Sequence, residues 1–487
     1  LKSLPLAECQ FESGRGHHWI MLIYDFVIIG SGPAGSVLAW NLAKTNYKVA
    51  IIDRATNTTT ESGKNDFIFS PYVNNCPKNY SPLFSNQLGG NSALWNNKIY
   101  LLSESEFDAG DWPFTYDELL KYSKDIANKF DIDHENIHQI IDNDNESFST
   151  SSREKKIGNI FNFLKIADNK NIDVYSSSSP TDLIFDDSQK KIKSLSIKNI
   201  LSKKSININL KNALIFCAGG LGNPNLIQNL IKKHPKNTGK YLCDHPHINL
   251  LNLNKKELKK KIKFAKYFIN NPKSKLEQNL FIKEKSYFAG IQIDFFADPT
   301  IIMKRVYLRT RSIFSKKFLN LLIKNYSLFI NIIYKILSIL RIKDKYSYEF
   351  FFSQGLNPEN VIELDDTIKD EYGLYKSNIY WKLSNHDKEN YQIIIKRFSE
   401  KNQINLKQKK YLKDDNKFFV GLHPSCSTIA TKDQNNTCVD KNLKLIGVDN
   451  LYTCGSSVFS NNGFTNPTWT IISLSNRLSY YLKDRFK

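Results

Sequence analysis

A glycine-rich turn between a strand and a helix near the start of this sequence limits the folds that the chain can adopt. Residues 24–29 (YDFVII) form an apolar run of strand length, and Gly30-Ser31-Gly32-Pro33-Ala34-Gly35 follows it directly. The next residues, SVLAWNLAK, predict a helix, and a second apolar run, KVAIID, ends at Asp53. This order of strand, glycine turn, helix and strand predicts a βαβ unit.

The glycine spacing in this unit matches G-x-G-x-x-G, the pattern of dinucleotide-binding turns. Gly30 permits the tight turn, Gly32 lets the backbone approach a pyrophosphate, and Gly35 lets helix and strand pack closely. The start of the helix offers free N–H groups to the phosphates, and Asp53 is placed to accept hydrogen bonds from an adenosine ribose. The pattern predicts a dinucleotide site without separating FAD from NAD. The alternative is a glycine turn that only packs.

The rest of the chain continues the α/β pattern less clearly. Short alternating runs between residues 172 and 216 predict a β-meander that closes on a buried strand, ALIFCAGG. The polar residues 131–155 are expected to form a loop. Residues 250–420 contain two or three candidate strands and two candidate helices, and the chain after residue 418 returns to glycine-rich segments before a last predicted helix.

Size and charge narrow the class of protein. The chain has 487 residues, of which 41% are hydrophobic, so it has enough apolar residues for two packed domains or one large unit with a cap. A net charge of +20 suggests nucleic acid or an anionic membrane as a partner. The lysines, however, are scattered with asparagine and isoleucine along the whole chain, which indicates a compositional bias. We therefore predict no nucleic-acid partner.

The cysteines and two segments outside the motifs provide predictions about where in the cell the protein lies. The chain has 7 cysteines, an odd number without a C-x-x-C pair, which favours reduced thiols in a cytoplasmic protein and no metal site. Residues 1–20 lack a signal-peptide pattern, and we expect them to be an extension without fold significance before a natural start at Met21. The apolar, lysine-containing stretch 318–342 predicts either a buried helix or one that lies on a membrane surface, at the inner face.

Further motifs follow the glycine turn in a fixed order. They are LGGNSALW at 88–95, DWP at 111–113 with YDELLKY, ALIFCAGGLGNPNLI with TGKYLCDHP, LNPENVIELDD with DEYG, and His423-Pro424 with a tail containing CGSSVFSNNGFTNPTWT. Together with the glycine turn they resemble the glucose–methanol–choline (GMC) oxidoreductases over most of residues 24–487. The DWP phrase and Trp95, where many relatives have Asn, are similar to the branch that oxidises sugars and polyols.

The resemblance implies an α/β fold, with a Rossmann-like FAD-binding domain and an inserted antiparallel-sheet substrate domain. The FAD-binding domain is expected to comprise residues 21–110, 155–250 and 418–487. The substrate domain is expected to comprise residues 111–154 and 251–417. A substrate cleft is then expected between the two domains.

The resemblance also implies FAD as the cofactor. Some relatives bind FAD covalently through a histidine in the G-G-x-S loop, where this chain has Leu94, so we predict non-covalent FAD. The residues that the motifs assign to the cofactor are Gly30, Ser31, Gly32, Pro33, Ala34, Gly35, Asp53, Gly89, Gly90, Ser92, Trp95, Ala218, Gly219, Gly455, Ser456, Pro467 and Thr468.

A catalytic pair is implied at His423 and Asn466. Histidine titrates near neutrality and suits the removal of an alcohol proton, and the resemblance makes His423 the active-site base. Asn466 would hold the alcohol oxygen while a hydride leaves for flavin N5. His423 could instead be a packed core histidine, and Asn466 could be the N-cap of the last helix. His245 is expected in a structural turn near the cofactor, and His247 and His386 are expected to be surface or packing residues.

The predicted function is therefore FAD-dependent oxidation of a CH–OH group in a sugar, polyol or related alcohol, with a mild preference for a dehydrogenase over an oxidase. The alternatives are an NAD(P)H-dependent flavoenzyme or monooxygenase, and a catalytically silent flavin-binding scaffold. The first would need a second G-x-G-x-x-G, which the sequence lacks. The expected partners are a small alcohol or sugar and an unknown electron acceptor.

Overall fold

The computed structural model of the chain describes residues 22–55, 67–69, 85, 87–95, 99–134, 140–143, 146–150, 157–252, 278–284, 287–295, 346–401, 412–413 and 417–487. The predicted extension 1–20 and the apolar stretch 318–342 lie outside these residues. The structure therefore does not test either prediction.

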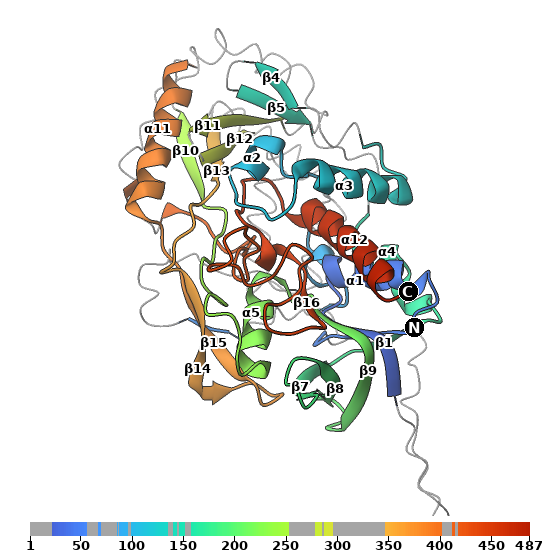
Figure 1. Cartoon of the computed structure of the whole chain (residues 1–487). Helices are drawn as coiled ribbons and strands as arrows, with labels where there is room; N and C mark the ends of the chain where they lie inside the picture. The colour runs from blue at the N-terminus through green and yellow to red at the C-terminus, as the bar shows by residue number, and fades with distance from the viewer. Residues whose placement is uncertain are drawn as a thin grey trace, which may run out of the picture.

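A seven-stranded sheet forms one half of the protein (Figure 1), in the order β6-β2-β1-β9-β8-β7, with β16 beside β9. Strand β1 lies parallel to β2 on one side and to β9 on the other, as a βαβ unit requires. Strands β7, β8 and β9 pair antiparallel, which confirms the later part of the predicted meander, whereas its first run, β6, pairs in parallel with β2 at the opposite edge. The strands are β1 (Leu22–Ile29), β2 (Val49–Ile52), β6 (Ile172–Tyr175), β7 (Ser178–Phe185), β8 (Ile192–Asn199), β9 (Ser205–Phe216) and β16 (Leu451–Thr453).

Three helices from distant parts of the chain pack together beside this sheet (Figure 1): α1 (Pro33–Ala43), α3 (Tyr116–Phe130) and α12 (Thr468–Arg485). α12 contacts both α1 and α3. A buried hydrogen bond of 3.0 Å from Asn41 to Asn476 joins α1 to α12. The last helix of the chain is therefore part of the layer that the first βαβ unit begins.

A six-stranded antiparallel sheet forms the other half, in the order β10-β13-β12-β11-β5-β4. The last two strands in this order, β5 and β4, fall in residues 131–155, so the expectation of a loop there was wrong. Of these two, only β4 lies at the edge of the sheet, and the short sequences IIDN and ESFST carry too few apolar residues to indicate strands on their own. The strands are β4 (Ile140–Asn143), β5 (Glu146–Thr150), β10 (His247–Asn252), β11 (Gln278–Glu284), β12 (Tyr287–Phe295) and β13 (Tyr346–Phe352).

The remaining elements connect the two halves. A small sheet joins β14 (Val361–Lys369), β15 (Tyr375–Tyr380) and β3 (Phe67–Phe69), and α11 (Asn385–Lys401) packs on the antiparallel sheet. Helix α5 (Gly219–Leu230) follows β9 directly. The predicted fold class, a Rossmann-like α/β unit with an added antiparallel sheet, is confirmed. The division into domains stays a prediction, and β10 already belongs to the antiparallel sheet although it begins before residue 251.

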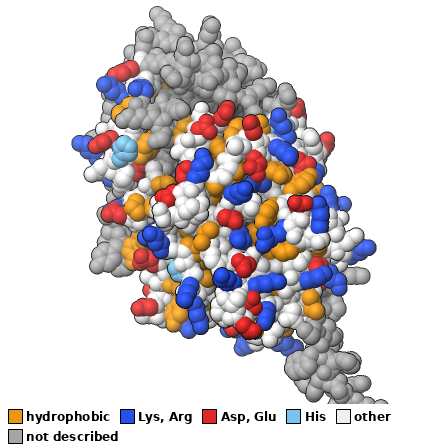
Figure 2. Space-filling view, in the orientation of Figure 1, with side chains coloured by type: hydrophobic (Ala, Val, Ile, Leu, Met, Phe, Trp, Pro, Cys, Tyr) orange, Lys and Arg blue, Asp and Glu red, His pale blue; other side chains and the backbone are white. Residues whose placement is uncertain are grey.

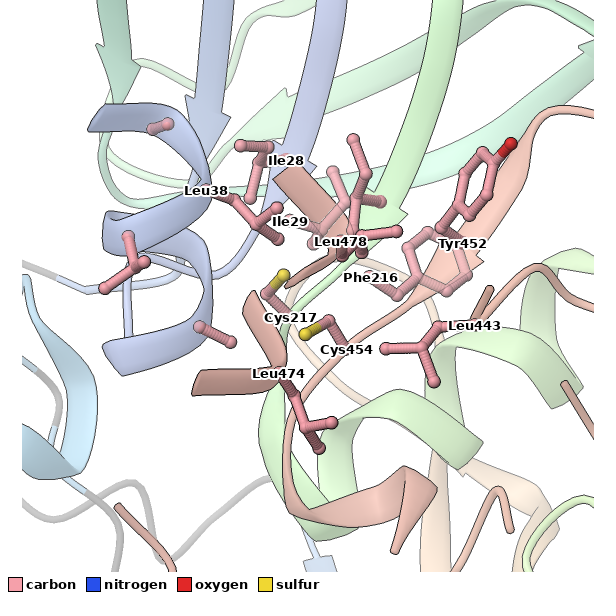
Figure 3. Close-up of a cluster of buried hydrophobic side chains, with 14 of the residues drawn as sticks. Ile28, Ile29, Leu38, Phe216, Cys217, Leu443, Tyr452, Cys454, Leu474 and Leu478 are labelled. Atoms are coloured by element: carbon pink, nitrogen blue, oxygen red, sulfur yellow. The ribbon is translucent and has the colours of Figure 1, made fainter. Parts of the chain in front are cut away.

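Two hydrophobic clusters hold these layers together. In the first, side chains from β1, α1, β9, β16 and α12 meet (Figure 3); they include Ile28, Leu38, Phe216, Tyr452, Leu474 and Leu478. In the second, α11 packs on β13, and the Tyr391 ring stacks on Phe352 with centroids 4.0 Å apart. Each such fully buried side chain contributes about 1.5–3 kcal/mol of burial free energy.

The five cysteines in the described ranges, Cys217, Cys243, Cys426, Cys438 and Cys454, are free and buried. Figure 2 shows Lys and Arg spread over the visible face among Asp and Glu rather than gathered in one patch. Within the described ranges, none of the helices has the length and apolarity needed to cross a membrane.

Candidate active site

The glycine turn after β1 is shaped by close backbone contacts. Gly30 has φ +104°, and a Cβ there would lie 2.5 Å from the Cys217 carbonyl oxygen. A Cβ on Gly35 would lie 1.9 Å from the Gly30 oxygen, whereas a Cβ on Gly32 would meet nothing within 4 Å. Packing therefore demands glycine at positions 30 and 35, and Gly32 opens onto free space.

Asp53 ties the end of β2 to this turn. Its carboxylate accepts hydrogen bonds from the backbone N–H groups of Ser31, at 2.5 Å, and Ala55, at 2.7 Å. The side chain also lines the large cavity described below. The predicted contact with a ribose stays a prediction.

The second glycine turn, at residues 89–92, packs against the first. The Gly89 N–H donates to the Ser31 hydroxyl at 2.9 Å, and the space for a Cβ on Gly90 is closed by the Gly32 Cα at 3.1 Å. The Ser92 hydroxyl donates to the Gly89 carbonyl at 2.6 Å. The two turns predicted to hold the cofactor thus pack directly on each other, and this contact leaves no room for a side chain at Gly90.

Three helices begin at the cavity. The N-cap residues of α1, α5 and α12 are Gly32, Ala218 and Pro467, and in each case no side chain caps the helix start. All three residues line the cavity. Helix starts carry unpaired N–H groups and a partial positive charge, so three of them around one space favour an anionic or electron-rich ligand.

A single cavity of about 760 Å³ joins these turns to the predicted catalytic residues. Ligand sites typically enclose about 300–1,000 Å³, so the space suits a large cofactor. Most of the predicted site residues line this cavity. The exceptions are Ser31, Gly35 and Gly89, which belong to the glycine turns but do not line the cavity themselves. Gly455 and Ser456 line it from the segment after β16.

His423 and Asn466 lie together in this cavity. The Asn466 side-chain nitrogen Nδ2 is 3.4 Å from His423 Nε2, and both residues line the space. Asn466 precedes the N-cap of α12, which is Pro467, so its side chain does not cap the helix. The structure thus brings together two side chains that are far apart in the sequence.

Asp244 anchors the loop that carries His423. Its Oδ1 accepts hydrogen bonds from the backbone N–H groups of His423, at 3.0 Å, and His245, at 2.7 Å. The Asn462 amide donates to the Asp244 carbonyl at 2.6 Å, which links this loop to the segment that leads to Asn466. Burial raises the pKa of the Asp244 carboxyl to about 7, although the backbone N–H groups oppose the shift.

This raised pKa predicts a pH-dependent stability difference. The folded-state pKa lies above the ordinary value of 3.8, so the contribution of Asp244 to stability is present in acid and is lost as pH rises to about 7. Asp244→Asn keeps the acceptor oxygen and does not titrate. The free energy of unfolding of the wild type minus that of the variant should therefore fall between about pH 4 and 7 and then level off. Denaturant titrations across this range measure the difference, and a difference that is constant or rises with pH contradicts the assignment.

Glu106 anchors the loop before Asn466 in the same way. One oxygen accepts from the Phe464 N–H at 2.9 Å, and the other accepts from the Ser103 N–H at 2.9 Å as part of a capping box. Burial raises the pKa of this carboxyl. A buried carboxyl group therefore fixes the backbone next to each residue of the predicted pair: Asp244 beside His423, and Glu106 before Asn466.

His245 lies beside His423 with ring centroids 5.0 Å apart. Its Nε2 donates to the Asn462 carbonyl at 3.0 Å, and burial lowers its pKa to about 4. His245 is therefore neutral at pH 7 and adds no charge next to His423. His245 lines the cavity, and its expected place near the cofactor stays a prediction.

Several cavity residues were missed in the sequence. Arg54, Ser178 and Ser179 line the cavity, as do His247, which was expected at the surface or in packing, and Glu349. A lone Glu within the aromatic strand YSYEFFF was the one available signal, because a charged residue is rare in a buried strand. In the part of the chain that the structure describes, no group of three or more His, Cys, Asp or Glu side chains could hold a metal ion.

Comparison with known proteins supports the fold over the whole chain. Similar solved structures include a formate oxidase (TM-score 0.62, 13% identity, 96% of this chain and 99% of that one). A pyridoxine 4-oxidase from Mesorbium loti has TM-score 0.61 and 14% identity, covering 94% and 99% of the two chains. An FAD-dependent oxidoreductase from Chaetomium thermophilum has TM-score 0.59 and 14% identity, covering 95% and 99%.

The sequence itself matches two family models and one curated relative. Residues 28–82 match the NAD(P)-binding Rossmann-like domain. A geranylgeranyl diphosphate reductase from Rhodobacter capsulatus is 53% identical over 32 residues, which are 7% of this chain and 8% of that protein. Residues 357–475, which include His423 and Asn466, match the GMC oxidoreductase model. Residues 357–475 are therefore similar to a GMC oxidoreductase domain, and the Rossmann-like unit and the fold agree with this match.

Proposed function

We propose that this protein is an FAD-dependent enzyme that oxidises a CH–OH group of a sugar, polyol or related alcohol. The observation that carries the proposal is the His423–Asn466 pair, 3.4 Å apart, in the same cavity as the glycine turns. A dinucleotide site and a base beside an amide are the two parts that such a reaction needs.

The cavity fits FAD in its chemistry. The three uncapped helix starts suit the pyrophosphate and the electron-rich ring, and the open space at Gly32 lets a phosphate approach the backbone. Asp53, Gly90 and Thr468 line the same space. When bound, FAD supplies the acceptor for the hydride that leaves the alcohol carbon.

His423 and Asn466 would act on the alcohol oxygen. Two nitrogen atoms 3.4 Å apart can both reach one oxygen at about 2.9 Å. His423 Nε2 would take the hydroxyl proton, and the Asn466 amide would donate to the oxygen and hold the C–H bond in place. His245 stays neutral because of its lowered pKa, so it does not repel the proton that His423 receives.

A screen of substrates without oxygen tests the proposal. A sugar, polyol or simple alcohol should bleach the bound flavin, since electrons then stay on the cofactor, and the absorbance near 450 nm would record it (about that wavelength for any flavin). Bleaching by NADH or NADPH alone would favour the NAD(P)H-dependent alternative. A flavin that neither donor bleaches would favour a silent scaffold. Re-oxidation by air or by an added quinone would then identify the class of acceptor.

FAD should be bound without a covalent link. Leu94 lies at the matching place of the G-G-x-S loop and lines the cavity, but its alkyl side chain has no group that can bond to the flavin. Precipitating the protein with acid should leave all yellow colour in the supernatant. Colour in the washed pellet contradicts this prediction, and heat-denatured protein digested with protease provides the control for trapped flavin.

A further inference from the structure

The wall of the cavity formed by β10 and β13 carries polar side chains that the proposed reaction does not use. In the antiparallel register His247 is opposite Phe351, and Asn249 is opposite Glu349. Residues directly opposite, or two positions along, share one face of a sheet. His247, Glu349 and Phe351 all line the cavity, together with His423 and Asn466.

His247 is buried in an arrangement that leaves a polar atom without a partner. Its side chain is 7% exposed, and its Nε2 has no hydrogen-bond partner among the described residues. Its Nδ1 lies 3.6 Å from a Glu349 oxygen, and its ring meets Phe351 edge-on with centroids 4.3 Å apart. A buried polar atom left unpaired costs about 1–3 kcal/mol, so an arrangement that keeps one calls for a ligand.

We propose that His247 and Glu349 form a second hydroxyl-binding subsite, which selects polyhydroxylated substrates. This inference rests on the proposed function, because the subsite lies in the same cavity as the pair that would oxidise the alcohol. A hydroxyl group both donates and accepts hydrogen bonds. The Glu349 carboxylate accepts from it, and the imidazole Nε2 donates or accepts according to its proton.

His247 and Glu349 disfavour other kinds of alcohol. An alcohol with a simple hydrocarbon chain would leave His247 Nε2 unpaired in the complex. A substrate with its own carboxylate would be repelled by Glu349, which lies beside His247 in this wall. An alcohol that carries a quaternary ammonium group would be attracted to Glu349, but that group cannot form a hydrogen bond with the imidazole of His247. A neutral polyol satisfies both groups.

Three variants test the subsite against simple alcohols. In His247→Leu and Glu349→Leu, kcat/KM for the best of glycerol, sorbitol and glucose should fall about 10- to 100-fold, as expected for the loss of a hydrogen bond that involves a charged or buried group. The same parameter for propan-1-ol should stay within about threefold, because that substrate does not reach the subsite. His247→Gln should recover part of the loss. Glu363→Gln, on the exposed face of β14, is the matched control.

Thermal stability provides a readout that does not need turnover. The polyol should raise the Tm of the wild-type holoenzyme and of Glu363→Gln, but not that of His247→Leu or Glu349→Leu. Without polyol, His247→Leu should be at least as stable as the wild type, because it removes an unpaired buried atom. A purely structural role for His247 predicts the opposite.

The outcomes separate the subsite from the proposed function. Equal losses for polyols and propan-1-ol, unchanged polyol kinetics, or a preference for choline that Glu349→Leu abolishes would each overturn the subsite. If no alcohol bleaches the wild-type flavin, the proposed function fails. The Tm comparison then still decides whether His247 and Glu349 bind polyols.

Discussion

Replacing His423 with alanine should lower kcat by about 100- to 10,000-fold, the range that a positioned base contributes. The side chain lies in the cavity with its Nε2 3.4 Å from Asn466 Nδ2, so its loss removes the group placed to take the hydroxyl proton. Residues of the glycine turns are untouched, and the variant should keep its flavin. Stopped-flow reduction under anaerobic conditions measures the rate, and the ratio of flavin to protein absorbance measures the retained cofactor.

His234→Ala is the matched control for this variant. His234 is partly buried, bonds to the backbone carbonyl of Pro235 and does not line the cavity, so its loss should leave the reduction rate within about twofold. A raised pH should partly restore His423→Ala, because alkoxide then forms without a protein base. Unchanged turnover in His423→Ala would remove His423 from the mechanism.

The second large effect is expected from alanine at Gly35 and at Gly32, in the turn at residues 30–35. The first substitution should lower stability, and the second should weaken cofactor binding. In Gly35→Ala the new Cβ would lie 1.9 Å from the Gly30 oxygen, so the turn must move and the protein should be destabilised by about 1–3 kcal/mol or more. In Gly32→Ala the Cβ meets nothing within 4 Å and points into free space, and the N-cap has φ −59°, which alanine adopts easily. The protein should fold normally, but the methyl group would occupy the approach to the cofactor.

Comparing the two variants separates folding from cofactor binding. Apoprotein of Gly32→Ala should unfold at the wild-type Tm, while its Kd for FAD rises about 10-fold or more, equivalent to about 1.4 kcal/mol or more. Gly35→Ala should lose both stability and flavin. Calorimetry of the apoproteins and flavin titration measure the two effects. Full flavin affinity in Gly32→Ala would show that the backbone at this position does not face the cofactor.

The local parts of the fold were visible in the sequence because they depend on neighbouring residues. The glycine turn at 30–35 works within a few residues of chain, and its spacing, the strand before it and the helix after it are all readable. The pairing of His423 with Asn466 came from a resemblance of ordered motifs rather than from periodicity. The structure supports their proximity, since the two residues line one cavity.

The features that the sequence did not reveal depend on contacts between distant segments of the chain. β4 and β5 were missed because β4 pairs with β5, and β5 in turn pairs with β11, which lies more than a hundred residues later in the chain. His247 appeared to be a packing residue because nothing nearby in the sequence indicates that Glu349 lies beside it. Asp244 was part of a recognised motif, but its role in fixing the His423 loop became visible only from the hydrogen bonds.

Strand β16 has a consequence for synthesis of the protein. It pairs with the second half of β9, so that part of the parallel sheet has an open edge until residues near the C-terminus arrive. At translation rates of about 5–20 residues per second, roughly 10–50 s separate the emergence of Phe216 from that of Leu451. During this interval the nascent chain exposes an apolar strand edge that can pair with other chains. Production of the holoenzyme should therefore depend on chaperones that shield this edge, and a chain cut short before β16 should aggregate rather than fold as a stable half.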